Sequence, residues 1–220
     1  MKLYLSSYRI GNSKEELIKW VNEHNKDILV IANALDVYPD GERKTNGILE
    51  KCQELENLGF HPIHFDLRKY FNHPELLRKE IKDFRAFYVL GGNVFVLRQA
   101  MKLSGFDDYL LEISNNPDYL YSGFSAGICV LATNLQGIHL ADDLQQDPYH
   151  YSEIIWNGVG LIDYMPVPHF ESPDHPESHL MYEVVSYLQH HHLKYKTLKD
   201  GDVILEDLSI SHDNLNSKAR

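Results

Sequence analysis

YLYSGFSAGICVL, residues 119–131, is the stretch from which the fold is most directly derived. Its aromatic and aliphatic first part predicts a buried strand, and its apolar last part predicts a helix. Gly123 and Gly127 flank Ser125 at the junction, in the Gly-x-Ser-x-Gly pattern of a nucleophile elbow. The glycines leave room for a sharp turn that lifts the serine Oγ clear of the sheet. The first N–H groups of the helix would then lie where a reaction that develops an oxyanion needs them.

Apolar runs alternate with helical periodicities along the part of the chain that precedes this stretch. This alternation is typical of βαβ units and predicts an α/β fold with a mainly parallel sheet and right-handed crossovers. The Ser-x-x-Glu pattern from Ser13 to Glu16 has the form of a capping box at a helix start. We expect strands at residues 3–6, 27–34, 61–67 and 86–90, and helices near residues 14–21, 48–55, 77–84, 94–103 and 106–113.

The second half of the chain is less regular. Residues 136–151 are polar and are expected to form a loop or a short hairpin near the site. Residues 165–170 are expected to be extended because of their two prolines. A helix is predicted at residues 177–189. Residues 195–198 and 202–205 are predicted to form a C-terminal hairpin around the Asp200-Gly201 turn. Residues 214–220 are expected to be a frayed tail.

Composition restricts the class of protein. The 220 residues, 43% of them hydrophobic, are enough for one sizeable core and favour a single domain over residues 1–220. The net charge of −11 argues against nucleic acid or an anionic membrane as a partner. The two cysteines, Cys52 and Cys129, both lie in helical patterns, which argues against disulfides. With no signal peptide or apolar run of about 18 residues, we expect a cytoplasmic protein.

A nucleophilic serine needs a base and oxyanion donors. The backbone N–H groups of Ala126, directly after Ser125, and of Gly92, in a glycine-rich loop after a neighbouring strand, are the expected donors. Among 13 histidines, His169 is the favoured base because it follows the rigid segment from Pro166 to Pro168. The alternative is that Ser125 only packs in its turn or binds an anion.

His175 and His179 are four residues apart, a spacing that would place two metal ligands on one helical face. No glutamate follows His175 as a metalloprotease motif requires, and Pro176 lies between the two histidines. We therefore expect no metal and no cofactor.

Three ordered motifs resemble those of the dipeptidase E type of serine peptidase, a family that includes cyanophycinases: residues 91–97 (GGNVFVL), 123–127 (GFSAG) and 168–170 (PHF). The resemblance implies a peptidase-like domain with a flavodoxin-like three-layer α/β/α fold, akin to glutamine amidotransferases. It implies Ser125 as nucleophile, His169 as base, and Gly92 with Ala126 as oxyanion donors. Gly91 and Asn93, beside Gly92, would contact substrate.

The same resemblance implies that the acid of the triad lies in the turn after the last helix, where Asp200 stands. Asp143, some way after the nucleophile, is the alternative acid. An Asp-Gly pair is also the commonest hairpin turn signal, so Asp200 has a purely structural explanation as well. A Ser…Asp…His order with Asp143 or Asp163 as acid would instead indicate an α/β-hydrolase esterase.

The expected substrate is a small peptide, since known members of the resembled family cleave a dipeptide after an N-terminal aspartate, or aspartyl links in a polymer. Arg98, Arg9 and His139 are candidates by charge for reading an acidic side chain. A protein that binds peptides or anions without turnover is the third alternative. Aromatic residues such as Trp20 and Tyr119 would permit a homodimer interface.

Overall fold

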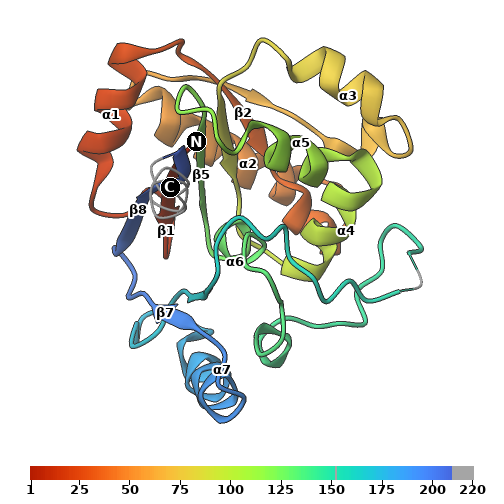
Figure 1. Ribbon diagram of the computed structural model, residues 1–220, viewed down its shortest axis with the longest axis vertical. Coiled ribbons are helices and arrows are strands. Elements are labelled where there is room, and N and C mark those ends of the chain that lie inside the picture. Colours follow the sequence, from red (N-terminus) through yellow and green to blue (C-terminus); the bar gives the residue numbers. More distant parts are fainter. Residues whose placement is uncertain (152, 210–220) are drawn as a thin grey trace, which may run out of the picture.

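A central β-sheet organises the computed structural model, which describes residues 1–151 and 153–209 (Figure 1). Within these residues the sheet has six strands in the order β3-β2-β4-β5-β1-β8. Neighbouring strands are parallel, except that β8 runs antiparallel to β1. The strands are β1 (Lys2–Ser6), β2 (Asp27–Ile31), β3 (His61–His64), β4 (Ala86–Val89), β5 (Leu120–Phe124) and β8 (Val203–Asp207). The predicted mainly parallel α/β fold is confirmed.

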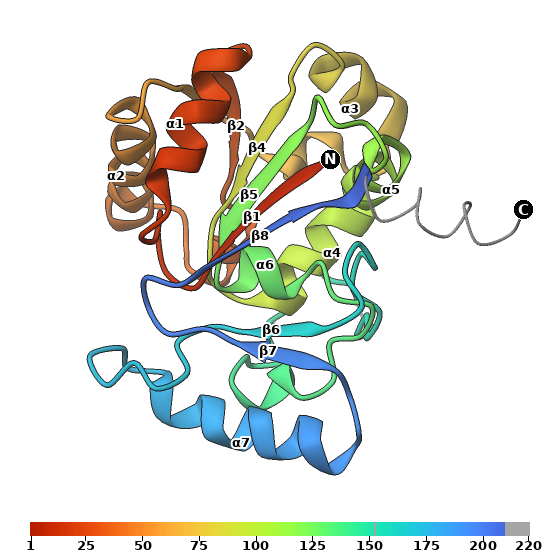
Figure 2. The same cartoon turned by 60° about the vertical axis from the view of Figure 1, so that its left-hand side comes forward.

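Helices cover both faces of this sheet (Figure 2). Helices α1 (Lys14–Glu23) and α2 (Glu42–Glu56) pack on one face, and α3 (Pro74–Ile81), α4 (Val94–Ser104) and α5 (Phe106–Ile113) pack on the other. Side chains alternate along a strand, so successive residues of β4 face opposite sides of the sheet. Phe87 faces the core under α3 to α5, and Tyr88 faces the core under α1 and α2. This is the three-layer α/β/α arrangement that the resemblance implied.

The strand order explains where a site can form. Strands β3-β2-β4-β5, counted from β2, run in the order 2-1-3-4 of a flavodoxin-like sheet. The carboxyl ends of parallel strands lie along one edge, where ligands of such folds bind. The segments that follow β2, β4 and β5 at that edge are η1 (Asn33–Val37), the Gly91-Gly92-Asn93 loop and the short helix α6 (Ala126–Cys129).

The predicted C-terminal hairpin is wrong. Strand β7 (Tyr195–Thr197) pairs in parallel with β6 (Met165–Val167) in a separate small sheet, whereas β8 joins the edge of the main sheet beside β1. The Asp-Gly turn itself is present, since the N–H of Asp202 donates to the carbonyl of Lys199 at 2.9 Å. Its two flanking strands diverge because each finds its partner elsewhere. Helix α7 (Ser178–His190) packs against the small sheet (Figure 2).

Side-chain hydrogen bonds explain two strands that end earlier than predicted. After β2, the Oδ1 of Asn33 accepts from the N–H of Leu67, and its Nδ2 donates to Asp36 and Asp66. These bonds turn the chain into η1 instead of extending the strand to residue 34. After β3, Asp66 accepts from the N–H of Arg68 and starts the short helix η2 (Leu67–Tyr70).

Four further predictions concern the cap of α1, the two cysteines, residues 136–151 and the C-terminal tail. Helix α1 forms where predicted, but the Ser13 side chain makes no capping hydrogen bond. Cys52 and Cys129 are helical, and neither is in a disulfide. The loop predicted at residues 136–151 contains one short helix, η3 (Ile138–Leu140). The tail at residues 214–220 lies outside the described residues.

Two further findings concern surfaces. Trp20 and Tyr119, named above as interface aromatics, are only 3% and 7% exposed, so they belong to the core. No helix in the described part of the chain combines the length and the apolar character needed to cross a lipid bilayer.

Candidate active site

Ser125 stands on a strained turn between β5 and α6. Its backbone has φ 51° and ψ −122°, a conformation that L-residues rarely adopt and that persists only where the surroundings impose it. The carbonyl of Ser125 accepts from the N–H groups of Ile128 and Cys129, which starts the helix directly after the serine. The turn therefore has the form of a nucleophile elbow.

Close backbone packing explains the two glycines of the elbow. A Cβ on Gly127 would lie 2.3 Å from the carbonyl oxygen of Val89, and one on Gly123 would lie 2.7 Å from the same atom. The end of β4 thus passes directly beneath the turn, and only glycine leaves room for it. This packing places the loop after β4 next to the serine.

The loop after β4 supplies the second predicted oxyanion donor. Gly92 has φ 141°, and a Cβ there would lie 2.4 Å from the carbonyl oxygen of Ala34 in η1. Within the described residues, no acceptor takes a hydrogen bond from the N–H of Gly92 or of Ala126. Both N–H groups are therefore free to bind an oxygen of a ligand.

Asn93 and Gly91 hold this loop in place. The Asn93 Oδ1 caps α4 by accepting from the N–H groups of Phe95 and Val96 at 2.9 and 3.0 Å. Its Nδ2 donates to the carbonyl of Asp143. A Cβ on Gly91 would lie 2.9 Å from the Cβ of Ser125. Both residues line the cavity described below, but the polar groups of the Asn93 side chain are already hydrogen-bonded.

His169 and Asp200 form a close pair. The Nδ1 of His169 lies 2.7 Å from the Oδ1 of Asp200, and the histidine is 1% exposed. An ionised carboxylate only accepts hydrogen bonds, so Nδ1 carries the proton and Nε2 presents a lone pair. Burial lowers the pKa of His169 below its ordinary value, and the hydrogen bond to Asp200 opposes this effect. The imidazole is therefore favoured in its neutral, basic form.

Two buried serines position this pair, and sequence reasoning missed both. The Ser7 Oγ accepts from the N–H of His169 at 2.8 Å and lies 3.0 Å from the Oδ1 of Asp200. The Ser172 Oγ accepts from the N–H of Asp200 at 2.8 Å. Ser7 follows β1, more than 160 residues before His169 in the chain, and no local pattern connects the two.

A second histidine lies against His169. The rings of His169 and His175 stack in parallel, with centroids 3.5 Å apart and planes at 3°. Tyr8 meets both rings edge-on, at 5.9 and 5.5 Å between centroids. The sequence offered no signal for this stack, because the spacing considered for His175 pairs it with His179. The Nδ1 of His179 instead lies 2.9 Å from the carbonyl of Pro176.

One cavity of about 580 Å³ joins these groups. Its walls include Ser125, His169 and His175, the Gly91-Gly92-Asn93 loop, and the charged side chains Lys51, Asp142, Asp143 and Glu177. Within the described residues no direct hydrogen bond links Ser125 to His169. Such contacts are often long in ligand-free sites and tighten when a substrate binds.

The two neighbouring aspartates differ in environment. Asp142 accepts from the N–H of Val94 at 2.7 Å, and burial raises its pKa to about 7. Asp143 is exposed, and hydrogen bonds from Gln145 and then Gln146 hold its pKa below the ordinary value. Asp143 therefore lies in the wall of the cavity, while Asp200 is the acid hydrogen-bonded to His169.

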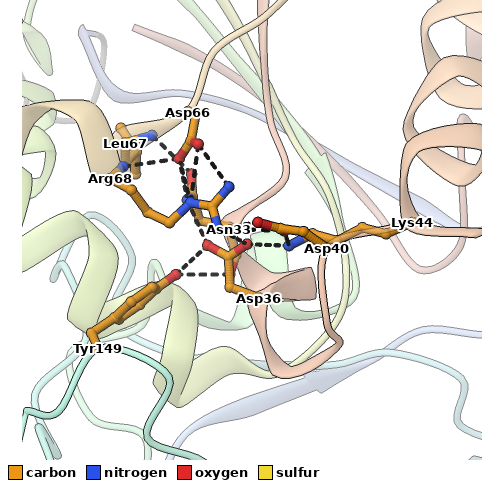
Figure 3. Close-up of polar contacts among 8 residues, drawn as sticks. All are labelled: Asn33, Asp36, Asp40, Lys44, Asp66, Leu67, Arg68 and Tyr149. Atoms are coloured by element: carbon orange, nitrogen blue, oxygen red, sulfur yellow. Dashed lines mark hydrogen bonds and ion pairs between the residues drawn. The ribbon is translucent and has the colours of Figure 1, made fainter. Parts of the chain in front are cut away.

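A polar cluster fixes the loop that carries both aspartates (Figure 3). The hydroxyl of Tyr149 donates to Asp36 at 2.5 Å, and Lys44 pairs with the same carboxylate. Arg68 lies between Asp66 and Asp40, at 2.8 and 3.1 Å. Since Asp36 belongs to η1, whose Ala34 contacts Gly92, the cluster connects two walls of the cavity.

The three residues predicted to bind a substrate carboxylate do not line this cavity. Arg98 is buried in an ion pair with Asp107 at 2.9 Å. Arg9 pairs with Glu50 and Glu54, each at 3.0 Å. His139 packs edge-on against Trp156 and Tyr187. Asp163, the acid of the esterase alternative, pairs with Lys194 on the surface.

The protein has a three-layer α/β fold in which Ser125, on a strand-to-helix turn, and His169, hydrogen-bonded to Asp200, line one cavity. The family model of peptidase family S51 matches residues 8–208. The chain belongs to peptidase family S51, the dipeptidase E family, so the resemblance seen in the sequence is confirmed.

Individual relatives agree with this assignment. The uncharacterized peptidase Lin0382 of Listeria innocua is 31% identical over 121 residues, 54% of each chain. The uncharacterized peptidase Lmo0363 of Listeria monocytogenes is 32% identical over 96 residues, 44% of this chain and 43% of the relative. The aligned part of the chain spans about half the length of these curated relatives or less.

Solved structures share the fold. A crystal structure from Listeria monocytogenes EGD-e, described as a "Putative Peptidase E Protein", has a TM-score of 0.72 at 21% identity and covers 94% of this chain and 98% of its own. A peptidase from an acI-B1 Actinobacterium has a TM-score of 0.64 at 17% identity and covers 93% and 82%. At these identities the likeness concerns the fold alone.

Proposed function

We propose that the protein is a serine peptidase that hydrolyses short peptides through an acyl-enzyme. The observation that carries the proposal is that Ser125 and His169 line one cavity, while the Nδ1 of His169 is hydrogen-bonded to Asp200. Membership of peptidase family S51 supports the same reaction class.

The proposed first step forms the acyl-enzyme. The Oγ of Ser125 attacks the scissile carbonyl carbon while the Nε2 of His169 takes the hydroxyl proton. Asp200 keeps the imidazole in the tautomer with Nδ1 protonated and stabilises the imidazolium. The N–H groups of Gly92 and Ala126 donate to the oxyanion. His169 then passes its proton to the leaving amine, and the carbon–nitrogen bond breaks.

The second step releases the acid. Water loses a proton to the Nε2 of His169 and attacks the acyl carbon, and the proton returns to Ser125 as its ester bond breaks. His169 takes part in every proton transfer of this cycle.

The geometry favours this reading over the esterase alternative. In that alternative the acid precedes the histidine in the chain, as Asp143 and Asp163 do. The carboxylate hydrogen-bonded to His169 is that of Asp200, which follows it.

We further propose that the preferred substrates are peptides with aspartate at the first position. Lys51 is the only lysine or arginine among the described residues that line the cavity, and it already pairs with Glu50 and Glu54 at 3.3 Å. It is the cation that a substrate carboxylate would have to use. Lys51→Gln should then raise KM for Asp-X peptides and leave KM for Ala-X peptides much less affected.

A screen of dipeptides varied at the first residue, run with the wild type and Ser125→Ala, tests the proposal. We expect hydrolysis of some dipeptides by the wild type and its loss in the variant at equal thermal stability. Equal turnover by both proteins would contradict the assignment of Ser125.

A further inference from the structure

Three potential metal ligands meet at the catalytic base. One ligand atom from each of His169, His175 and Glu177 lies within 4.8 Å of the other two. All three residues line the cavity that holds Ser125. We propose that this group binds Zn²⁺, and that the bound ion inhibits the peptidase by occupying the Nε2 of His169. The binding stands by itself, whereas the inhibition rests on the proposed function.

His169 is already oriented as a metal ligand. In zinc sites a ligating histidine commonly donates its other ring N–H to a carboxylate, which fixes the tautomer and raises the basicity of the ligating nitrogen. The Nδ1 of His169, at 2.7 Å from the Asp200 carboxylate, makes such a hydrogen bond. The feature that makes His169 a base, a fixed lone pair on Nε2, therefore also makes it a ligand.

His175 and Glu177 are free to complete the site. Both lie in the segment between β6 and α7, where His175 is partly exposed and Glu177 is exposed. Ligands about 2.0–2.2 Å from a tetrahedral zinc are about 3.4 Å apart, so the three atoms must close by an ångström or so. The His175 ring must also tilt from its parallel stack so that its lone pair points at the ion. The tilt exchanges the stack on His169 and the edge contact with Tyr8 for a bond to the ion. The Nδ1 of His175 has a long contact, 3.3 Å, with the N–H of Glu177.

The ligand set selects the type of cation. Two imidazole nitrogens and one carboxylate suit Zn²⁺ and similar transition metals, whereas Mg²⁺ and Ca²⁺ prefer oxygen ligands alone. A water molecule would fill the fourth position. An ion held there takes the lone pair that would otherwise accept the Ser125 proton, so the chemistry stops while the ion is bound.

Direct titration in the Ser125→Ala background tests binding without using turnover. Zn²⁺ is added in competition with a chromophoric chelator at pH 7.5, and His175→Ala and Glu177→Gln are compared with the parent. Each should weaken the tightest site by about 10-fold or more, the range seen when even supporting groups of metal sites are removed. His179→Ala is the matched control, because it removes a nearby exposed histidine outside the group.

The outcomes separate clearly. Selective loss in His175→Ala and Glu177→Gln supports the site. Unchanged affinity in both variants, or an equal loss in His179→Ala, overturns it. Both variants change exposed or partly exposed side chains, so their folding can be checked by thermal melting.

Turnover tests the inhibition separately. Zn²⁺ should inhibit the wild type, a chelator should restore activity, and His175→Ala should need about 10-fold more Zn²⁺, relative to its own metal-free rate. Full turnover at a Zn²⁺ concentration that saturates the titrated site overturns inhibition. Zn²⁺ binding that depends on His175 in a protein with no peptidase activity supports the site and contradicts the proposed function.

Discussion

The two halves of the candidate site are built by different means. The elbow is formed by the local backbone: Gly123 and Gly127 leave room for the end of β4, and Ser125 takes a strained conformation between them. The His169–Asp200 pair is formed by side chains from distant segments, with Ser7 linking them. The first half needs particular residues at fixed spacing, whereas the second needs particular partners in space. Substitutions in the two halves should therefore differ in how they affect kcat and the free energy of unfolding.

The largest expected effect concerns the distant partners. Asp200→Asn should lower kcat about 10⁴-fold with little change in stability, because the amide favours the wrong imidazole tautomer. Steady-state kinetics on an active dipeptide measure this effect. Asp143→Asn is the matched comparison, and a larger loss of kcat in that variant would move the role of the acid to Asp143.

The next effect concerns the local backbone. Gly127→Ala should lower the free energy of unfolding by about 3 kcal/mol, since its Cβ would lie 2.3 Å from the Val89 carbonyl oxygen in a buried site. Denaturant unfolding gives this value. Gly47→Ala in α2, where a Cβ meets nothing within 4 Å, is the control and should stabilise the protein by up to about 1 kcal/mol. Equal stability of the two variants would show that the elbow tolerates a side chain.

Ser7 links the first strand to the His169–Asp200 pair, so under the proposed function its removal should affect catalysis and stability together. Ser7→Ala should lower kcat about 10-fold with KM nearly constant, and should cost about 1–3 kcal/mol of stability because the buried His169 N–H loses its acceptor. Ser114→Ala, which removes a hydroxyl bonded to the nearby Leu111 carbonyl, is the control. A change in KM alone would contradict a positioning role for Ser7.

The smallest expected effect is on the pH dependence of stability. The pKa of Asp142 is raised to about 7 in the folded state, so the unfolded chain loses this proton first as pH rises above about 4. The folded protein therefore loses stability between pH 4 and pH 7. Asp142→Asn keeps an acceptor for the Val94 N–H and should raise the free energy of unfolding at pH 8 by about 1 kcal/mol, with no gain at pH 4. The expected gain is smaller than the full pKa shift would give, because the Asp142 side chain is partly exposed and solvent screens its charge. An equal gain at both pH values would contradict the raised pKa.

The same difference between local and distant contacts explains what the sequence could predict. The elbow, its buried strand and the helices α4 and α5 follow from local spacing, and all are present. The proline segment before it favours His169 as the base, and the family resemblance implies Asp200. Ser7, Ser172 and the His175 stack depend on contacts between segments far apart in the chain, which periodicity does not encode. The C-terminal hairpin failed for the same reason, since β7 and β8 each pair with a distant strand.

The central claim is that Ser125 is an activated nucleophile, and reaction with a fluorophosphonate probe tests it most directly. The wild type should be labelled once, with the adduct mapped by peptide mass spectrometry to Ser125. Labelling should be absent in Ser125→Ala and much slower in Asp200→Asn. A folded wild-type protein that stays unlabelled, or that carries the adduct on another residue, would contradict the account.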